Sequence, residues 1–236
     1  MFKPFLLLSL GVSLLFVSCS AHISGTIYEN GSADVSIRAS LEPKTAALLK
    51  SFSQDPGDFS IDGAAIGKSM ISTPGIGSVQ FRNIDPSTID GTIKINKIDD
   101  FLVAGESKID AYRLAKYTQN TGGGSLSISL DLAKGPELIS LFSSDVADYL
   151  SAIMAPIATG EVLTVQEYLG LVTSVYGSGV SNEIKNAMVA ISFSMPGTVK
   201  SVKGGTFVKN QANFSVPLTD LLVLEKPVLY EIVWTK

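Results

Sequence analysis

The stretch ISGTIYENGSADVSIRASL, residues 23–41, decides the fold because it encodes a complete β-hairpin. Asn30-Gly31 is a strong hairpin-turn dipeptide, since both residues tolerate a positive φ. After this turn, apolar and polar residues alternate strictly from residue 33 to residue 38. Such alternation is typical of a strand with one buried face. The stretch therefore predicts two antiparallel strands joined by a tight turn.

A six-residue motif in this hairpin, Gly-Thr, an apolar residue, two further residues and Asn, occurs three times, at residues 25–30, 91–96 and 205–210. Each copy reads as a strand, a turn and a second strand; in the second copy, the second strand covers residues 97–105. The copies are unequally spaced, which argues against a solenoid of stacked repeats. Gene duplication and chance recurrence in a β-rich chain both account for the pattern.

Further strands are predicted from apolar runs that are bounded by turn residues. They cover residues 78–84, 109–117, 125–132, 189–195, 199–202 and 228–234. The polar, glycine-rich segment 118–124 lies between two of these runs, so residues 109–117 and 125–132 are expected to pair across it. The strands thus lie in both the first and the last parts of the chain.

Helices are predicted mainly in the middle of the chain. Pro43 fits the first position of a helix over residues 43–52. Apolar residues recur at steps of three and four between residues 136 and 153, and Thr164 with Glu167 forms a capping box for a helix that ends at Gly177. Ser181 is expected to cap a short helix over residues 182–188. The order predicts an α+β fold, in which helices between about 136 and 188 pack on an antiparallel β-sheet built from hairpins.

The N-terminus has the pattern of an export signal. Lys3 precedes thirteen uncharged, mostly apolar residues, 5–17. This run is too short to span a bilayer, but it fits the apolar region of a secretory signal peptide. After Ser18 comes Cys19, the only cysteine of the 236 residues. Residues 1–18 are therefore predicted to be a signal peptide and residues 19–236 a single extracytoplasmic domain.

Residues 16–19, Phe-Val-Ser-Cys, resemble the lipobox of bacterial lipoproteins. That resemblance implies a diacylglyceryl group on the Cys19 sulfur, cleavage just before it, and a lipid anchor at the periplasmic face or the cell surface. A free thiol in an ordinary secreted protein is the alternative. His22 is expected to lie in a short tether next to the anchor. With a formal net charge of −4 and no basic cluster, the chain offers no surface for nucleic acid.

The residues of an active site are not assembled in this sequence, so we expect no enzyme, cofactor or metal. Residues 63–69 look like a phosphate-binding loop but have three residues between the glycines instead of four, which favours a loop or short helix. His22 is the only histidine, which leaves serine–histidine catalysis and zinc binding unsupported. The acidic pair Asp99-Asp100 suits acid–base work or calcium, but a solvated strand end explains it better.

The helical region carries enough apolar residues to suggest a ligand site. The candidate lining residues are Phe142, Tyr149, Met154, Tyr168 and Tyr176. In one interpretation they pack on the sheet as ordinary core; in the other they enclose an apolar pocket for a lipid, with tyrosines at the rim. The sequence thus favours a membrane-anchored binding module for a lipid or other apolar ligand. A structural lipoprotein that contacts other envelope proteins is the alternative.

The signal with its lipobox cysteine, residues 23–43, the late turn MPGTVKSV at 195–202 and the closing PVLYEIVW at 227–234 together resemble the LppM-like family of bacterial lipoproteins. The resemblance covers about residues 19–100 and 189–236. It implies a small α+β domain next to the anchor, an envelope location and an apolar cavity suited to lipidic ligands. The apolar helices are also similar in style to those of spirochaetal lipoproteins.

Overall fold

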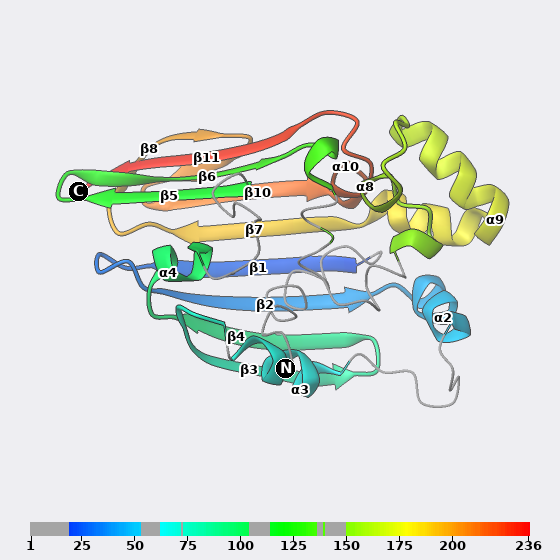
Figure 1. Cartoon of the computed structure of the whole chain (residues 1–236), viewed down its shortest axis with the longest axis horizontal. Coiled ribbons are helices and arrows are strands. Elements are labelled where there is room, and N and C mark those ends of the chain that lie inside the picture. Colours follow the sequence, from blue (N-terminus) through cyan, green and yellow to red (C-terminus); the bar gives the residue numbers. More distant parts are fainter. Residues whose placement is uncertain (1–18, 53–61, 72, 104–113, 136–138, 140–149) are drawn as a thin grey trace.

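The computed structural model describes residues 19–52, 62–71, 73–103, 114–135, 139 and 150–236. Its strands form a seven-stranded sheet of order β3-β4-β2-β1-β7-β10-β9 and a four-stranded sheet of order β5-β6-β11-β8 (Figure 1). The first sheet contains β1 (Cys19–Ile27), β2 (Ala33–Leu41), β3 (Ile76–Asp85), β4 (Thr88–Ile95), β7 (Met188–Ser194), β9 (Thr206–Val208) and β10 (Gln211–Pro217). The second contains β5 (Ala115–Asn120), β6 (Gly123–Leu130), β8 (Thr198–Lys203) and β11 (Val228–Thr235).

The predicted hairpin at residues 23–41 is confirmed. β1 and β2 pair antiparallel from Ile27 opposite Ala33 to Cys19 opposite Leu41, and Gly31 in the turn has a φ of 78°. The α+β class is confirmed as well, but the strands form two sheets and one pair is parallel, β1 with β7. A parallel pair requires a long crossover connection, and the segments between β1 and β7 provide it. Hairpin patterns in the sequence do not predict a pairing between strands so far apart along the chain.

Most of the other predicted strands are found near their expected bounds, as β3, β4, β6, β7, β8 and β11. The strand predicted at 109–117 is described only from residue 114, and there β5 begins at Ala115. The strand predicted at 97–105 is wrong, because the chain forms helix α4 (Ile98–Val103) instead. Asp99 and Asp100 lie in its first turn, where the positive end of the helix dipole favours carboxylates.

The helices match the sequence in part. Helix α2 (Pro43–Phe52) is confirmed, and α3 (Gly63–Met70) shows that the glycine-rich stretch forms a short helix. Helix α9 (Val165–Asn186) has the predicted capping box and a break at Gly177, whose φ of 83° is not helical. The predicted end at Gly177 is therefore confirmed, and a second helical part follows it, but Ser181 does not cap that part: its hydroxyl donates to the Leu169 carbonyl at 3.1 Å from within α9.

Three shorter helical segments complete the described elements. They are the 3₁₀ helix η3 (Leu132–Lys134), α8 (Pro156–Thr159) and α10 (Leu218–Val223). The last was not predicted, because it is only six residues long, follows β10 directly and is buried except at Asp220. Most of the predicted helix between residues 136 and 153 lies outside the described residues. Among the described residues, no helix combines the length and apolar content needed to cross a membrane.

The structure explains why each of the three copies of the six-residue motif begins with glycine. In each copy the glycine lies against a phenylalanine ring of the neighbouring strand; the pairs are Gly25 with Phe193, Gly91 with Phe81 and Gly205 with Phe214. A Cβ atom at any of these glycines would stand well inside van der Waals contact with the ring. Aromatic rings that cover glycines on neighbouring strands help to set the strand register. The repeated motif therefore marks sites of close packing between strands.

We expect Gly91→Ala to lower the free energy of unfolding by about 1–3 kcal/mol, because the new methyl group would overlap the Phe81 ring. Urea unfolding measures this change. Gly170→Ala on α9 is the matched control: a Cβ there meets no atom within 4 Å, and the better helix propensity should stabilise the protein by up to about 1 kcal/mol. Equal effects of the two substitutions would contradict the packing argument.

The core has two parts. Side chains of both sheets form the first, which includes Ile27, Phe214, Ile232 and the fully buried Trp234. Side chains of the seven-stranded sheet and of the helices form the second, which includes Ile37, Ile89, Ile153, Tyr168 and Leu222. The helices α2, α8, α9 and α10 lie together at one end of the sheets, called the helical end below (Figure 1).

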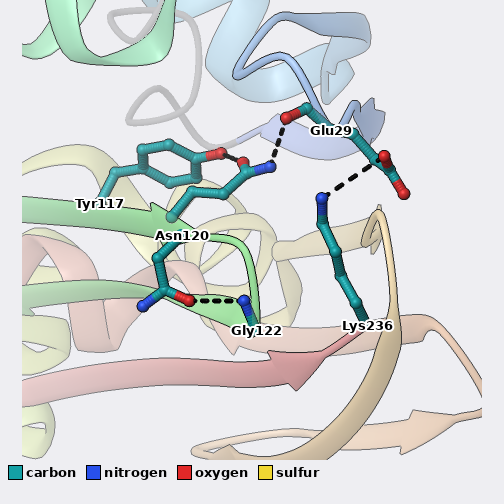
Figure 2. A network of polar contacts seen from close by, with 6 residues as sticks. Glu29, Tyr117, Asn120, Gly122 and Lys236 are labelled. Atoms are coloured by element: carbon teal, nitrogen blue, oxygen red, sulfur yellow. Dashed lines mark hydrogen bonds and ion pairs between the residues drawn. The ribbon is translucent and has the colours of Figure 1, made fainter.

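A polar network ties the two sheets together at the opposite end (Figure 2). The Gln119 amide donates to the Glu29 carbonyl at 2.6 Å, and the Lys236 ammonium lies 3.4 Å from the Glu29 carboxylate. The Tyr117 hydroxyl donates to the Gln119 side-chain oxygen. Burial and the charge of Asp99 raise the pKa of Tyr117 to about 12, so its hydroxyl stays protonated at neutral pH. The network joins the β1–β2 turn to β5 and has a structural role.

Candidate functional site

The predicted lipid attachment point lies at the helical end. Cys19 is the first residue of β1 and is paired with Leu41, two positions before α2 begins at Pro43. On its other side, β1 pairs with β7, which starts directly after α9. Cys19 therefore stands between the start of α2 and the end of α9.

The predicted tether around His22 is wrong. His22 lies inside β1, where it is paired with Arg38 of β2 and with Ala190 of β7. Backbone pairing on both sides orders the residues that directly follow Cys19, because each strand satisfies their N–H and C=O groups. Sequence reasoning missed this, since only the parallel partner β7 makes β1 an internal strand. The paired part of β1 therefore includes Cys19, the predicted anchor residue.

Carboxylates hold the N-termini of the two long helices at this end. Glu183 of α9 accepts hydrogen bonds from the backbone N–H groups of Lys44 and Thr45, at 3.0 and 2.8 Å, and from the Thr45 hydroxyl at 2.9 Å. Glu225 accepts from the Val165 N–H at 2.9 Å. Unpaired N–H groups and the helix dipole make these ends positive, so the carboxylates stabilise both helices and fix α2 against α9.

The capping box of α9 adds a third carboxylate. Glu167 accepts hydrogen bonds from the backbone N–H and the hydroxyl of Thr164, both at 2.8 Å. These hydrogen bonds lower the pKa of Glu167 below its usual value. The carboxylate therefore stays ionised through the neutral range, and its support for the helix end is lost only as the pH falls through this lowered pKa.

A shallow polar cleft of about 340 Å³ lies between α2 and the second half of α9. It is lined by Glu42, Lys44, Gly179, Asn182, Glu183, Asn186 and Ala187. Glu42 directly follows Leu41, the partner of Cys19, and Ala187 directly follows α9, so the cleft lies beside the start of β1. Its lining of charged and amide side chains differs from the apolar cavity that the sequence suggests, so the cleft is not that cavity.

Three of the five predicted lining residues are described, and they lie in neighbouring segments. Tyr168 is fully buried, and Tyr176, two turns further along α9, is half-buried. The Tyr176 hydroxyl donates to the Ala152 carbonyl, which brings it near the half-buried Met154. Met154 has a φ of 54°, a strained left-handed conformation for a residue with a side chain. Phe142 and Tyr149 lie outside the described residues, so the complete lining stays a prediction.

Among these three residues, Tyr168 has a buried polar group that makes no hydrogen bond to another described residue. Its hydroxyl oxygen is buried without a hydrogen-bond partner among the described residues. Burial and the neighbouring Tyr176 raise the pKa of Tyr168 well above its usual value, so the hydroxyl is a neutral donor. An unpaired buried hydroxyl costs free energy of about 1–3 kcal/mol. The site thus offers one unused hydrogen-bond donor within an apolar environment.

Four exposed apolar residues on or next to the helices are not among the site residues that the sequence predicts. Phe52, Val162, Leu171 and Val175 are exposed at the helical end. Leu171 and Val175 continue the apolar spacing of α9. That spacing alone does not show which apolar residues of the helix are buried and which are exposed. Among the described residues, no group of three or more His, Cys, Asp or Glu side chains is placed to hold a metal ion.

Comparison with known proteins finds a similarity in three dimensions. No family model matches the chain, and no curated protein sequence matches it. The structure is similar to the folded domain of the LppM protein from Mycobacterium tuberculosis, solved by NMR, with a TM-score of 0.44 and 12% sequence identity. The similarity covers 92% of this chain and 90% of that domain.

Proposed function

We propose that this chain is a bacterial envelope lipoprotein, anchored through lipid at Cys19, whose folded domain is a non-enzymatic binding module for a lipid or another apolar ligand. The observation that carries the proposal is the unpaired Tyr168 hydroxyl within the apolar core of the end where Cys19 is located. A lipid combines apolar chains with ester or hydroxyl oxygens, and such an oxygen accepts a hydrogen bond from a tyrosine.

The position of the anchor supports this function. Because β1 begins at Cys19, acyl chains on its sulfur hold the helical end close to the bilayer. Two or more acyl chains give stable membrane attachment, whereas a single chain binds only marginally. The tyrosine group is then within reach of membrane lipids. The ligand contacts Tyr168, Tyr176 and Met154 between α9 and the segment that precedes α8.

Native mass spectrometry of the full lipidated chain, released from detergent micelles, tests the ligand. We expect a second, non-covalent lipid mass that disappears on denaturation, whereas the mass of the covalent anchor remains. Tyr168→Phe keeps the ring but removes the donor, so it should lower the fraction of lipid-bound protein by about tenfold. Tyr28→Phe, at an exposed tyrosine in the β1–β2 turn, is the matched control. A chain that carries only its covalent anchor would refute lipid binding.

The alternative, a lipoprotein that contacts another envelope protein, has its own supporting observation. β9 is an edge strand of the seven-stranded sheet, and it exposes Phe207 and Val208, the latter at 66%. Exposed apolar side chains on an edge strand are a common site for pairing with another chain. A domain that retains no lipid, yet cross-links through a photoreactive group at position 208 to a second envelope protein, would favour this function.

A further inference from the structure

Four large apolar side chains at the helical end face water. Their exposed fractions are 49% for Phe52, 87% for Val162, 38% for Leu171 and 56% for Val175. We call these four residues the apolar rim. They belong to the last turn of α2, the segment before α9, and the first half of α9. Exposed apolar side chains that gather at one end of a domain indicate an interaction surface.

The rim is held by packed helices. Leu171 and Val175 are four residues apart and therefore neighbours on one side of α9. The Phe52 ring contacts the Tyr176 ring edge-on, with centroids 6.3 Å apart, which joins the end of α2 to α9. Behind the rim, Tyr168 and Val172 are fully buried. Leu171 and Val175 thus project from within α9, whereas Phe52 is the last residue of α2 and Val162 lies just before α9.

The anchor identifies what covers the rim. Cys19 is the first residue of an internal strand, and its partner Leu41 lies two positions from the start of α2. No linker separates the acylated residue from the folded domain, so the helical end remains next to the lipid. Tethering raises the effective concentration of membrane around the rim far above that of any soluble partner.

We propose that the helical end docks on the bilayer surface with the apolar rim inserted between the lipid headgroups. This inference rests on the proposed anchor at Cys19. The strands then point away from the membrane, and the network of Figure 2 lies at the distal end. Charged residues beside the rim have both signs, Lys50 near Phe52 and Glu161 and Glu167 near Val162. Docking is therefore driven by apolar burial, and it does not depend on anionic lipid or on salt.

Probes at the two ends of the domain test this orientation. In the full lipidated chain the Cys19 thiol is acylated, so Val175→Cys adds the only free thiol, and Thr121→Cys in the β5–β6 turn is the matched control. Each is labelled with nitrobenzoxadiazole and reconstituted into phosphatidylcholine vesicles. We expect blue-shifted emission and quenching by spin-labelled lipid at position 175, at low and at high salt. The probe at position 121 should show the emission of a probe in water and no quenching by spin-labelled lipid.

Vesicle flotation separates a failure of docking from a failure of the anchor. A chain that floats with the vesicles, but whose probe at position 175 is as exposed to water as the probe at position 121, overturns docking and leaves the anchor in place. A chain that does not float overturns the anchor and docking together. Leu171→Asn in the labelled chain should shift the emission at position 175 toward that in water, whereas Val208→Thr, at an exposed site on β9, should not.

Discussion

Trp234→Ala is expected to lower the free energy of unfolding by about 3–5 kcal/mol. Trp234 is 1% exposed and is the largest of the fully buried side chains. It packs near Tyr117, with ring centroids 6.1 Å apart, and over Gly124 of β6. Removing the indole leaves a cavity between the two sheets that the rigid strands cannot close. Because domains of this kind are stable by about 5–15 kcal/mol in total, a large part of the stability is lost.

Urea unfolding followed by circular dichroism measures this loss. Leu229→Ala, on the more exposed side of the same strand, is the control and should cost less than about 1 kcal/mol. Trp234→Phe should cost less than the alanine substitution, since it fills part of the space and removes an indole N–H that has no partner among the described residues. An alanine variant as stable as the control would show that the space between the sheets is not a packed core.

Cys19→Ser is expected to abolish acylation and the cleavage that depends on it. Intact mass spectrometry of the membrane fraction should show that the variant lacks the acyl mass and retains residues 1–18. The physical reason is that serine lacks the thiol on which the thioether to diacylglycerol forms. The folded domain should stay intact, because serine differs from cysteine only by an oxygen in place of the sulfur.

Ser18→Ala is the matched control for this prediction. It keeps a small residue at the cleavage site and leaves Cys19 in place, so its processing should equal that of the wild type. If Cys19→Ser were cut after residue 18 and carried the same mass as the wild type apart from the substitution, the chain would be an ordinary secreted protein with a free thiol. The proposed anchor would then be wrong.

The local elements of the fold follow from the sequence where neighbouring residues decide them. Asn30-Gly31 predicts the β1–β2 turn, and Thr164 with Glu167 predicts the start of α9, because these signals act within four residues. The strand predicted at 97–105 is wrong, because local signals are ambiguous there. Its apolar residues fit either period, and the two aspartates favour a helix start over a strand end. Short apolar segments are ambiguous until their neighbours in space are known.

From the sequence by itself come the prediction of an export signal before the one cysteine, the α+β class and the β1–β2 hairpin. Only the tertiary structure decided that the strands divide into two sheets, that β7 pairs in parallel with β1, and that Cys19 stands at the helical end. It also decided that Tyr168 is buried while Leu171 and Val175 face water. The physical reason is that turns and caps depend on contacts within a few residues, whereas pairing and burial depend on contacts between segments far apart along the chain.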